Sequence, residues 1–547
     1  MPDPFQAREL LIEYGFTLAM DNRLETPMVV RGALVASTCD VNCLAVHDAK
    51  SLNVLTLERP TVYAPFPDAH HNAFSRMMCI AQCYALLYDP AGPNFLKPFW
   101  EKWGLDGIQG VRQDVYAAVV AAKNGDSSSL GELLQGEDYH PFLMGQIVFL
   151  ELAQKFQTDG WNQNGALVYD EESGQPVPCT ANCEAYSDLI GYYPKNNPSS
   201  STGKARKKKR EKEEHNPFDN VASKYKVEGN DMYWQPLYED DGYGYFSHQM
   251  HVAPHIGYTV KPLLFDFVKD IGTVPDPKYD YRSEALQVVD RLRETASDAV
   301  KKEKIAVYDD KLLVRGMIEK EMRLQFKSVY SFEDELLFIH GIDAGEYDGL
   351  LVTWREKVDH DLVRPTTVIR KWGGDMLDTF SGDKSKDGPM KIAARDFQAF
   401  QRVMPHSEYP SASACLCTTY AQFADAFSKY YSDGFLADIK WAGDDGFKVG
   451  CVDGQEPFPF VSRGCDDVGF VIKDMETLGK ECGDSRLWAG LHFTQAVSAG
   501  EELCDGLGTM ALEYEKKIRN ESTFGSKYYQ DDARPICNAR RNLRKED

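Results

Sequence analysis

The sequence of 547 residues is notable first for what it lacks. No apolar stretch of about 18 residues is free of charged side chains, so we expect no membrane-spanning helix. It contains no glycine-rich phosphate loop, no nucleophile elbow and no H-E-x-x-H zinc motif. No internal repeat occurs at a fixed period, which argues against a solenoid. The common nucleotide-binding, serine-hydrolase and zinc-protease signatures are therefore absent.

Positive charge is also in short supply. The chain has 61 Lys and Arg against 84 Asp and Glu, a formal net charge of −23. A net-acidic surface repels nucleic acid and anionic membranes, so we expect neither as a partner. Any site for an anion must then be built from locally placed cations, which makes clusters of Lys, Arg and His informative.

The thirteen cysteines form an odd number, so at least one thiol is unpaired within a monomer. The opening residues Met1 to Phe5 include neither a basic nor a long apolar segment. We therefore expect a cytoplasmic location, with secretion left open. Cys179 and Cys183 have no second pair at zinc-finger spacing, so a loop disulfide or free thiols are favoured over a metal site.

Helical periodicity dominates the chain and predicts a mainly α fold, with two helical bundles and long connecting loops. Alternating strand patterns are few and short, and occur mostly near Val307 and over residues 258–260. We predict helices over residues 31–50, 72–88, 110–123, 284–304, 310–326, 343–371, 411–432, 467–480 and 486–517.

A basic block within residues 204–212 interrupts this pattern after a serine-rich stretch. It is typical of a solvated surface loop, although a localisation signal or a docking patch for an acidic partner is the alternative. It suggests three regions: an N-terminal helical region (1–195), an inserted loop region (196–280), and a C-terminal helical bundle (281–547) carrying an anion site.

Two cation-bearing segments lie in that C-terminal region. Lys357 and Arg364 are seven residues apart, which places both on one face if a single helix continues, although Pro365 disfavours helix at Arg364. The sequence predicts Arg486 in the first turn of a helix capped by Asp484 or Ser485, and a histidine follows at position 492. Each segment alone is more typical of an ordinary solvated or core helix.

Between these segments, Pro410 precedes a helix for which Ser411 or Ser413 is a suitable N-cap. A helix N-terminus presents free N–H groups and the positive end of the helix dipole, both of which favour an anion.

Together, K-x6-R-P, P-S-x-x and S-R-x5-H in this order form the signature that vanadium-dependent haloperoxidases share with type 2 phosphatidic acid phosphatases. The sequence resembles the haloperoxidase branch. The neighbouring residues support the resemblance: Trp354 before the lysine, H-x-E-Y-P-S from His406, and S-R-x-W-A-G-L-H-F from Ser485. Residues 234–237 and 254–257 resemble the loop that precedes the catalytic bundle in bacterial-type members.

The resemblance implies vanadate as the cofactor, with phosphate as a competing occupant, and His492 as the metal ligand. The other residues that it implies for the cofactor site are Lys357, Arg364, Ser411, the Ala412 N–H, Arg486 and, in the pocket wall, Trp354. The implied reaction is oxidation of halide by hydrogen peroxide to a hypohalous species, with Lys357 polarising the peroxide. A small organic acceptor is open, and dimers recur in the family, so a homo-oligomer is expected.

The sequence departs from the family at Ser413, where members carry a histidine that acts in proton transfer. Serine does not titrate near neutral pH, so this role falls to His360 or His406, with Glu408 as a weaker candidate, or is lost. His406 stands where bromoperoxidase-like members carry His and chloroperoxidase-like members carry Phe, which favours bromide or iodide. The alternatives are an acid phosphatase-like or other non-redox homologue, or an anion-binding protein without peroxidase activity.

Overall fold

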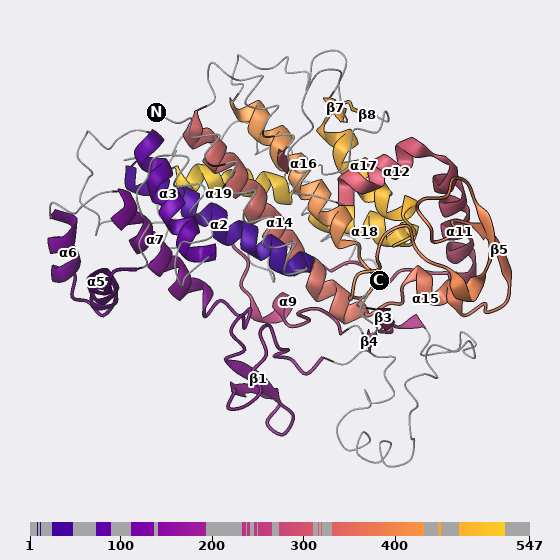
Figure 1. Ribbon diagram of the computed structural model, residues 1–547, viewed down its shortest axis with the longest axis horizontal. Coiled ribbons are helices and arrows are strands. Elements are labelled where there is room, and N and C mark those ends of the chain that lie inside the picture. The colour runs from indigo at the N-terminus through magenta and orange to yellow at the C-terminus, as the bar shows by residue number, and fades with distance from the viewer. Residues whose placement is uncertain are drawn as a thin grey trace, which may run out of the picture. The chain divides into compact units, whose positions relative to one another are not determined.

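The computed structural model is mainly helical, with a few short two-stranded antiparallel hairpins (Figure 1). It describes residues 25–47, 73–88, 111–135, 141–192, 273–309, 331–431 and 470–519, with shorter pieces at 8, 11, 232–236, 238–240, 246–248, 250–264, 315–316, 319 and 447–449. The predicted mainly α fold is confirmed. The basic block at 204–212 and most of the predicted helix 310–326 lie outside the described residues.

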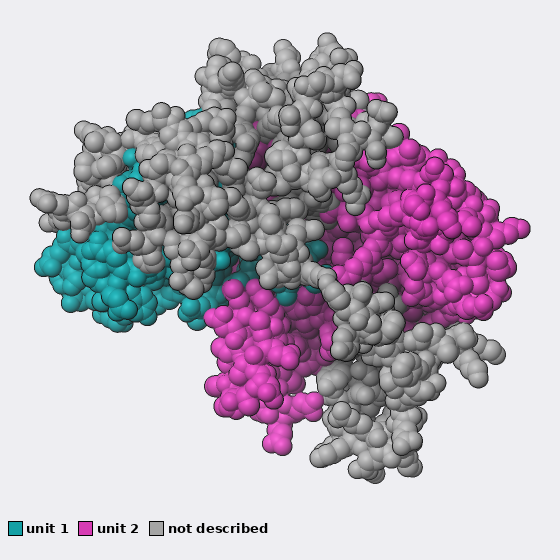
Figure 2. Space-filling view, viewed as in Figure 1, with its two compact units in different colours: residues 1–160, 326–347, 509–547 teal, residues 161–325, 348–508 magenta. Residues whose placement is uncertain are grey.

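The chain divides into two compact units (Figure 2). Unit 1 comprises residues 1–160, 326–347 and 509–547, and unit 2 comprises residues 161–325 and 348–508. The predicted boundaries at 195 and 280 stay predictions, as does the cytoplasmic location.

Unit 1 is built from helices, and two elements, α14 and α19, contribute residues to both units. The unit 1 helices are α2 (Thr26–His47), α3 (Ala73–Tyr88), α5 (Gln113–Lys123), α6 (Ser128–Gln135) and α7 (Pro141–Phe156). The shared helices are α14 (Phe332–His360) and α19 (Leu507–Ile518).

The remaining elements belong to unit 2. Its helices are α9 (Ile256–Thr259), α11 (Tyr281–Ser297), α12 (Ala299–Asp309), α15 (Pro365–Arg370), the 3-10 turn η4 (Ala394–Asp396), α16 (Ala412–Tyr431), α17 (Met475–Trp488) and α18 (Thr494–Cys504). The hairpins pair β1 (Leu167–Asp170) with β2 (Gln175–Pro178), β3 (Tyr238–Asp240) with β4 (Phe246–His248), β5 (Met376–Thr379) with β6 (Met390–Ala393), and β7 (Phe447–Val449) with β8 (Phe470–Ile472).

In unit 1, α2 and α3 are joined by the disulfides Cys39–Cys83 and Cys43–Cys79. The window Thr26–Ala45 of α2 is long and apolar enough to cross a membrane by length and composition, with mean hydropathy 1.3, but 72% of it is buried in the structure. Arg31 and Asp40 form buried ion pairs, with Asp159 and Arg8 respectively. These features are those of a core helix.

In unit 2, α16 is cross-linked to both of its neighbours. Cys417 pairs with Cys482 of α17, and Cys415 pairs with Cys504 of α18. A further disulfide joins Cys179 to Cys183, which settles the open interpretation of that pair in favour of a loop disulfide. Disulfides are typical of oxidising compartments.

The two predicted strand segments are wrong. Val307 lies in α12, where Ile305 and Tyr308 are buried with it on the inner side of the helix. Tyr258 and Thr259 lie in the short helix α9, because the His255 carbonyl accepts both of their backbone N–H groups and the Thr259 hydroxyl. Tertiary packing therefore overrides the strand preference of these β-branched and aromatic residues.

Candidate active site

Arg364 reaches the site because the helix that carries Lys357 ends before it. Helix α14 ends at His360, and Asp361 follows with a left-handed φ of 53°. Arg364 is extended, and Pro365 begins α15 at a position where its missing N–H costs nothing. The expectation that Lys357 and Arg364 share one helix face is therefore wrong. The turn at Asp361, held by Tyr192 Oη at 2.7 Å, brings the two cations together instead.

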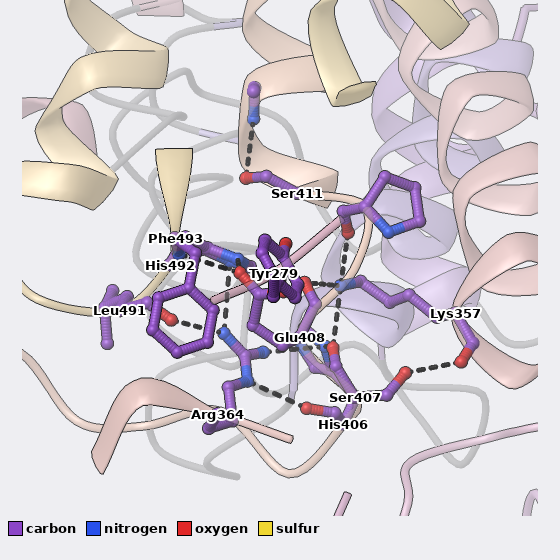
Figure 3. Close-up of polar contacts among 12 residues, drawn as sticks. Tyr279, Lys357, Arg364, His406, Ser407, Glu408, Ser411, Leu491, His492 and Phe493 are labelled. Carbon is purple, nitrogen blue, oxygen red and sulfur yellow. Dashed lines mark hydrogen bonds and ion pairs between the residues drawn. The ribbon is translucent and has the colours of Figure 1, made fainter. Parts of the chain in front are cut away.

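The Arg364 guanidinium is fully buried and donates in four directions (Figure 3). Nε donates to the His406 carbonyl at 3.0 Å, and Nη2 lies 3.0 Å from His406 Nδ1. Nη1 donates to the Leu491 carbonyl at 3.1 Å and lies 3.1 Å from His492 Nε2. This one side chain thereby ties the segment before α16 to the segment after α17.

The turn that carries His492 is encoded locally. Gly490 adopts a φ of 73°, and its N–H donates to the Leu487 carbonyl while the Leu491 N–H donates to the Arg486 carbonyl. This pattern is a Schellman motif with glycine at its left-handed position. Leu491 and Phe493 are then buried in the core, so the histidine between them is held in place.

Arg486 lies in the last turn of α17, not the first. The prediction of a helix beginning at Asp484 or Ser485 is wrong, because Asp474 caps α17 by accepting the Thr477 N–H at 2.7 Å. Arg486 Nη1 forms an ion pair with Asp309 at 2.6 Å, and Nε donates to Ser485 Oγ at 3.1 Å. Its buried Nη2 has no hydrogen-bond partner among the described residues.

Lys357 is buried, and its ammonium holds the segment that precedes α16. Nζ donates to the carbonyls of Ser407, Glu408 and Pro410 at 2.8, 3.1 and 2.6 Å. In return, the Ser407 hydroxyl donates to the Lys357 carbonyl at 2.6 Å. The charge of Lys357 is therefore held at a fixed position beside Arg364.

The N-terminus of α16 is capped as predicted. Ser411 Oγ accepts the Ala414 N–H at 3.3 Å, and Ala412 begins the helix. Helix α18 passes so close that a Cβ on Gly500 would lie 2.2 Å from the Ser411 carbonyl oxygen. Ser413 lies within the first turn of α16 and is half-buried.

The structure adds an acidic residue to the centre of this group. Glu408 is buried, and its Oε1 lies 3.1 Å from His492 Nδ1 and accepts the Phe493 N–H at 2.8 Å. Tyr279 Oη donates to Oε2 at 3.0 Å. Sequence reasoning missed Tyr279 and this role of Glu408, because the pattern H-x-E-Y-P-S gives no sign of which distant side chain the carboxylate meets.

The predicted compensating histidines are placed differently. His406 lies against Trp354, with ring centroids 4.8 Å apart, and its Nδ1 faces Arg364. His360 Nδ1 lies 3.0 Å from Asp276 and its Nε2 lies 3.5 Å from Glu356, so its ring nitrogens face acidic groups rather than the cation cluster.

A third histidine, which sequence reasoning missed, lies beside His406. The His251 ring centroid is 6.2 Å from that of His406 and 5.5 Å from that of Trp234. Its buried Nε2 has no hydrogen-bond partner among the described residues.

The burial of several cations close together determines most of the pKa shifts in this group. Burial lowers the pKa of Lys357 well below its usual value, and the nearby Arg364 lowers it further. Burial lowers the pKa of Arg364 to about 10. Burial, then Arg364 and Lys357, lowers the pKa of His492, so its imidazole is neutral. Glu408 offsets part of this repulsion, while burial raises its own pKa to about 7.

These groups fit a compact tetrahedral oxyanion such as vanadate. Lys357, Arg364 and Arg486 are buried cations, and the unpartnered Nη2 of Arg486 is a donor that lacks an acceptor. An anion would supply that acceptor and reduce the repulsion among the cations. His492 Nε2 faces the Arg364 guanidinium, and an imidazole nitrogen is a ligand suited to a transition metal.

Comparisons with known proteins identify similar folds. Residues 337–521 match the family model of the VCPO second helical-bundle domain. The structure is similar to the apo and holo forms of a bacterial vanadium-dependent chloroperoxidase, with TM-scores of 0.66 and 0.65, both at 16% identity and covering 91% of this chain and 95% and 93% of those chains. It is also similar to a bacterial vanadium-dependent iodoperoxidase, with a TM-score of 0.55 at 13% identity, covering 94% of this chain and 98% of that one. No curated protein matches the chain.

Proposed function

We propose that the chain is a member of the vanadium-dependent haloperoxidase family and that it is a peroxidase that oxidises halide with hydrogen peroxide. The observation that carries the proposal is the burial of Lys357, Arg364 and Arg486, whose charges all act on the imidazole of His492, with Arg364 in direct contact with it. Burying several positive charges together costs free energy, and a bound oxyanion reduces the repulsion among them.

Vanadate, when bound, acts as a Lewis acid that activates hydrogen peroxide towards halide without changing its oxidation state. His492 would hold the metal. Arg364 and Arg486 would hold its oxygens through their planar donor forks. Lys357 contributes a fixed positive charge, because peptide carbonyls hold its ammonium.

For the halide we propose bromide or iodide rather than chloride. His406 lies between Arg364 and Trp354, and its ring is more polar than the phenyl group it replaces in chloroperoxidase-like members. A His406→Phe variant should therefore shift the ratio of kcat/KM values away from bromide and towards chloride. An unchanged ratio would remove His406 from halide selection.

Position 413 supports a second candidate. Because Ser413 cannot shuttle a proton near neutral pH, a homologue that binds phosphate or its esters without peroxidase activity is also consistent with the same pocket. If the missing imidazole limits turnover, Ser413→His should raise the rate of bromide oxidation by up to about tenfold to a thousandfold, within the range of one positioned acid–base group.

The deciding experiment measures bromination of monochlorodimedone in the presence of bromide and hydrogen peroxide, with and without added vanadate. We expect activity that requires vanadate, that millimolar phosphate inhibits, and that His492→Ala abolishes. Hydrolysis of a chromogenic phosphate ester is measured in parallel. Ester hydrolysis without any vanadate-dependent bromination would refute the peroxidase and support the second candidate.

A further inference from the structure

Glu408 has an unusually complete set of donors around its side chain. Oε1 faces both the Phe493 N–H and His492 Nδ1, at 2.8 and 3.1 Å, and Oε2 accepts the Tyr279 hydroxyl at 3.0 Å (Figure 3). The backbone N–H of Phe493 can only donate, so Oε1 must be an acceptor. A carboxylate in this position therefore favours a proton on Nδ1 of His492.

The opposite side of the imidazole leads independently to the same tautomer. Arg364 Nη1 lies 3.1 Å from His492 Nε2, and a guanidinium nitrogen has no acceptor capacity. Nε2 must therefore present its lone pair, which leaves the proton of the neutral ring on Nδ1. The acceptor on one side and the donor on the other select the same form, although the two groups come from segments 44 residues apart, at positions 364 and 408.

We propose that Glu408 is a positioning residue that fixes His492 in the Nδ1–H tautomer and so keeps its Nε2 lone pair available to vanadium. The inference rests on the proposed function only for the identity of the metal. Carboxylates that accept the second N–H of a ligating histidine fix its tautomer and ring orientation in metal sites generally. Here the carboxylate is itself oriented by Phe493 N–H and Tyr279.

The charge of Glu408 allows the proposed positioning role to be distinguished from a general structural role of this side chain. The carboxylate lies near Lys357 and Arg364 and offsets their charges, so on charge alone it opposes the binding of any anion. Vanadate gains a bond to Nε2, whereas inorganic phosphate is held only by cations and hydrogen-bond donors. Removing the carboxylate should therefore affect the two anions in opposite directions.

The experiment measures the dissociation constants of orthovanadate and of inorganic phosphate by equilibrium dialysis for the full chain and its variants. In Glu408→Ala we expect vanadate affinity to fall about 10–100-fold, the usual effect of losing such a supporting partner. Phosphate affinity should stay the same or rise. Glu408→Gln keeps an oxygen that can accept from Nδ1 and should retain most of the vanadate affinity. Tyr279→Phe, which removes only the bond to Oε2, is the matched control.

The tautomer is read directly from the nitrogen shifts of 15N-labelled histidine in the vanadate-free protein. We expect a protonated Nδ1 on His492 in the parent chain, in Glu408→Gln and in Tyr279→Phe, and a mixture of tautomers in Glu408→Ala. Equal losses of vanadate and phosphate affinity would indicate a purely structural role, and equal gains a purely electrostatic one. Either result overturns the proposal.

A failure of the proposed function would look different. A parent chain that binds phosphate but not vanadate would refute the proposed cofactor, whereas the nitrogen shifts would still test the tautomer. A parent chain with Nε2 protonated would overturn the inference even if vanadate-dependent bromination were observed.

Discussion

The two disulfides on α16 should stabilise unit 2 by an amount that depends on their nesting. Cys415–Cys504 spans 89 residues and encloses Cys417–Cys482, which spans 65. With the inner bond intact, the outer bond closes a path of only about 24 residues, from 415 to 417 and from 482 to 504. The chain-entropy relation gives about 3.5 kcal/mol for closing a path of this length and about 4.6 kcal/mol for the full 89 residues.

Three variants test this calculation: Cys415→Ala with Cys504→Ala, Cys417→Ala with Cys482→Ala, and all four substitutions together. We expect free energies of unfolding lower by about 3.5, 3.2 and 7.8 kcal/mol, so that the combined loss exceeds the sum of the separate losses by about 1 kcal/mol. The measurement is guanidinium chloride unfolding without reductant, followed by tryptophan fluorescence.

The matched control removes Cys179–Cys183, whose sequence separation is only 4 and which should contribute about 2 kcal/mol. The reasoning is refuted if the outer α16 bond contributes no more than this control. It is also refuted if the four-substitution variant is no less stable than either double variant. In that case the closure of nested loops would not set the entropy of the unfolded state.

Three other predictions concern single residues of the two units. Gly500→Ala should lower the free energy of unfolding by about 1–3 kcal/mol or more, because the new Cβ would lie 2.2 Å from the Ser411 carbonyl oxygen. Gly32→Ala is the control, because its Cβ would meet nothing within 4 Å, and it should not be destabilising. Thermal unfolding compares the two variants. Ser411→Ala should cost about 1 kcal/mol by removing the acceptor for the Ala414 N–H, and an unchanged midpoint of denaturation would contradict that cap. Burial lowers the pKa of His251 to about 3, so the unfolded chain takes up this proton first as the pH falls below about 6.5 and stability drops by up to about 1.4 kcal/mol per pH unit. His251→Phe should make stability less dependent on pH between 6 and 4, and an identical slope would refute this assignment.

Much of the secondary structure around the site could be predicted because its signals are local. Ser411 after Pro410 indicates a capped helix start, as observed. Pro365 disfavours helix at Arg364, yet the periodicity favoured one helix over 343–371, which is wrong because α14 ends at His360 and α15 begins at Pro365. The beginning of α17 was mispredicted, because Ser485 and Asp484 resemble a cap although Asp474 performs that role eleven residues before Ser485. Residue types that form N-caps also occur inside helices. A helix start is therefore placed wrongly when it rests on a cap residue alone and the helical periodicity before that residue is overlooked.

The disulfides of unit 1 follow from the spacing of their cysteines along two helices. Cys39 and Cys43, and likewise Cys79 and Cys83, are four residues apart within predicted helices, which places each pair on one helix face. Two such faces can form two cross-links between adjacent helices. By contrast, Cys415 and Cys417 are two apart in α16 and point to different neighbours, so their partners depend on how α17 and α18 pack.

Local signals in the sequence predict the helical character of the chain and indicate the cations of the anion site, because residue preference, periodicity and capping act over a few residues. The tertiary structure decided which of these groups meet. Glu408 lies 84 residues from His492, and Arg486 lies 177 from Asp309. Contacts at such separations depend on the packing of α14, α16 and α17, because the chain between them can follow many paths that satisfy the same local preferences. For that reason the residues that supply charge were readable in the sequence, whereas the carboxylate that orients the histidine was not.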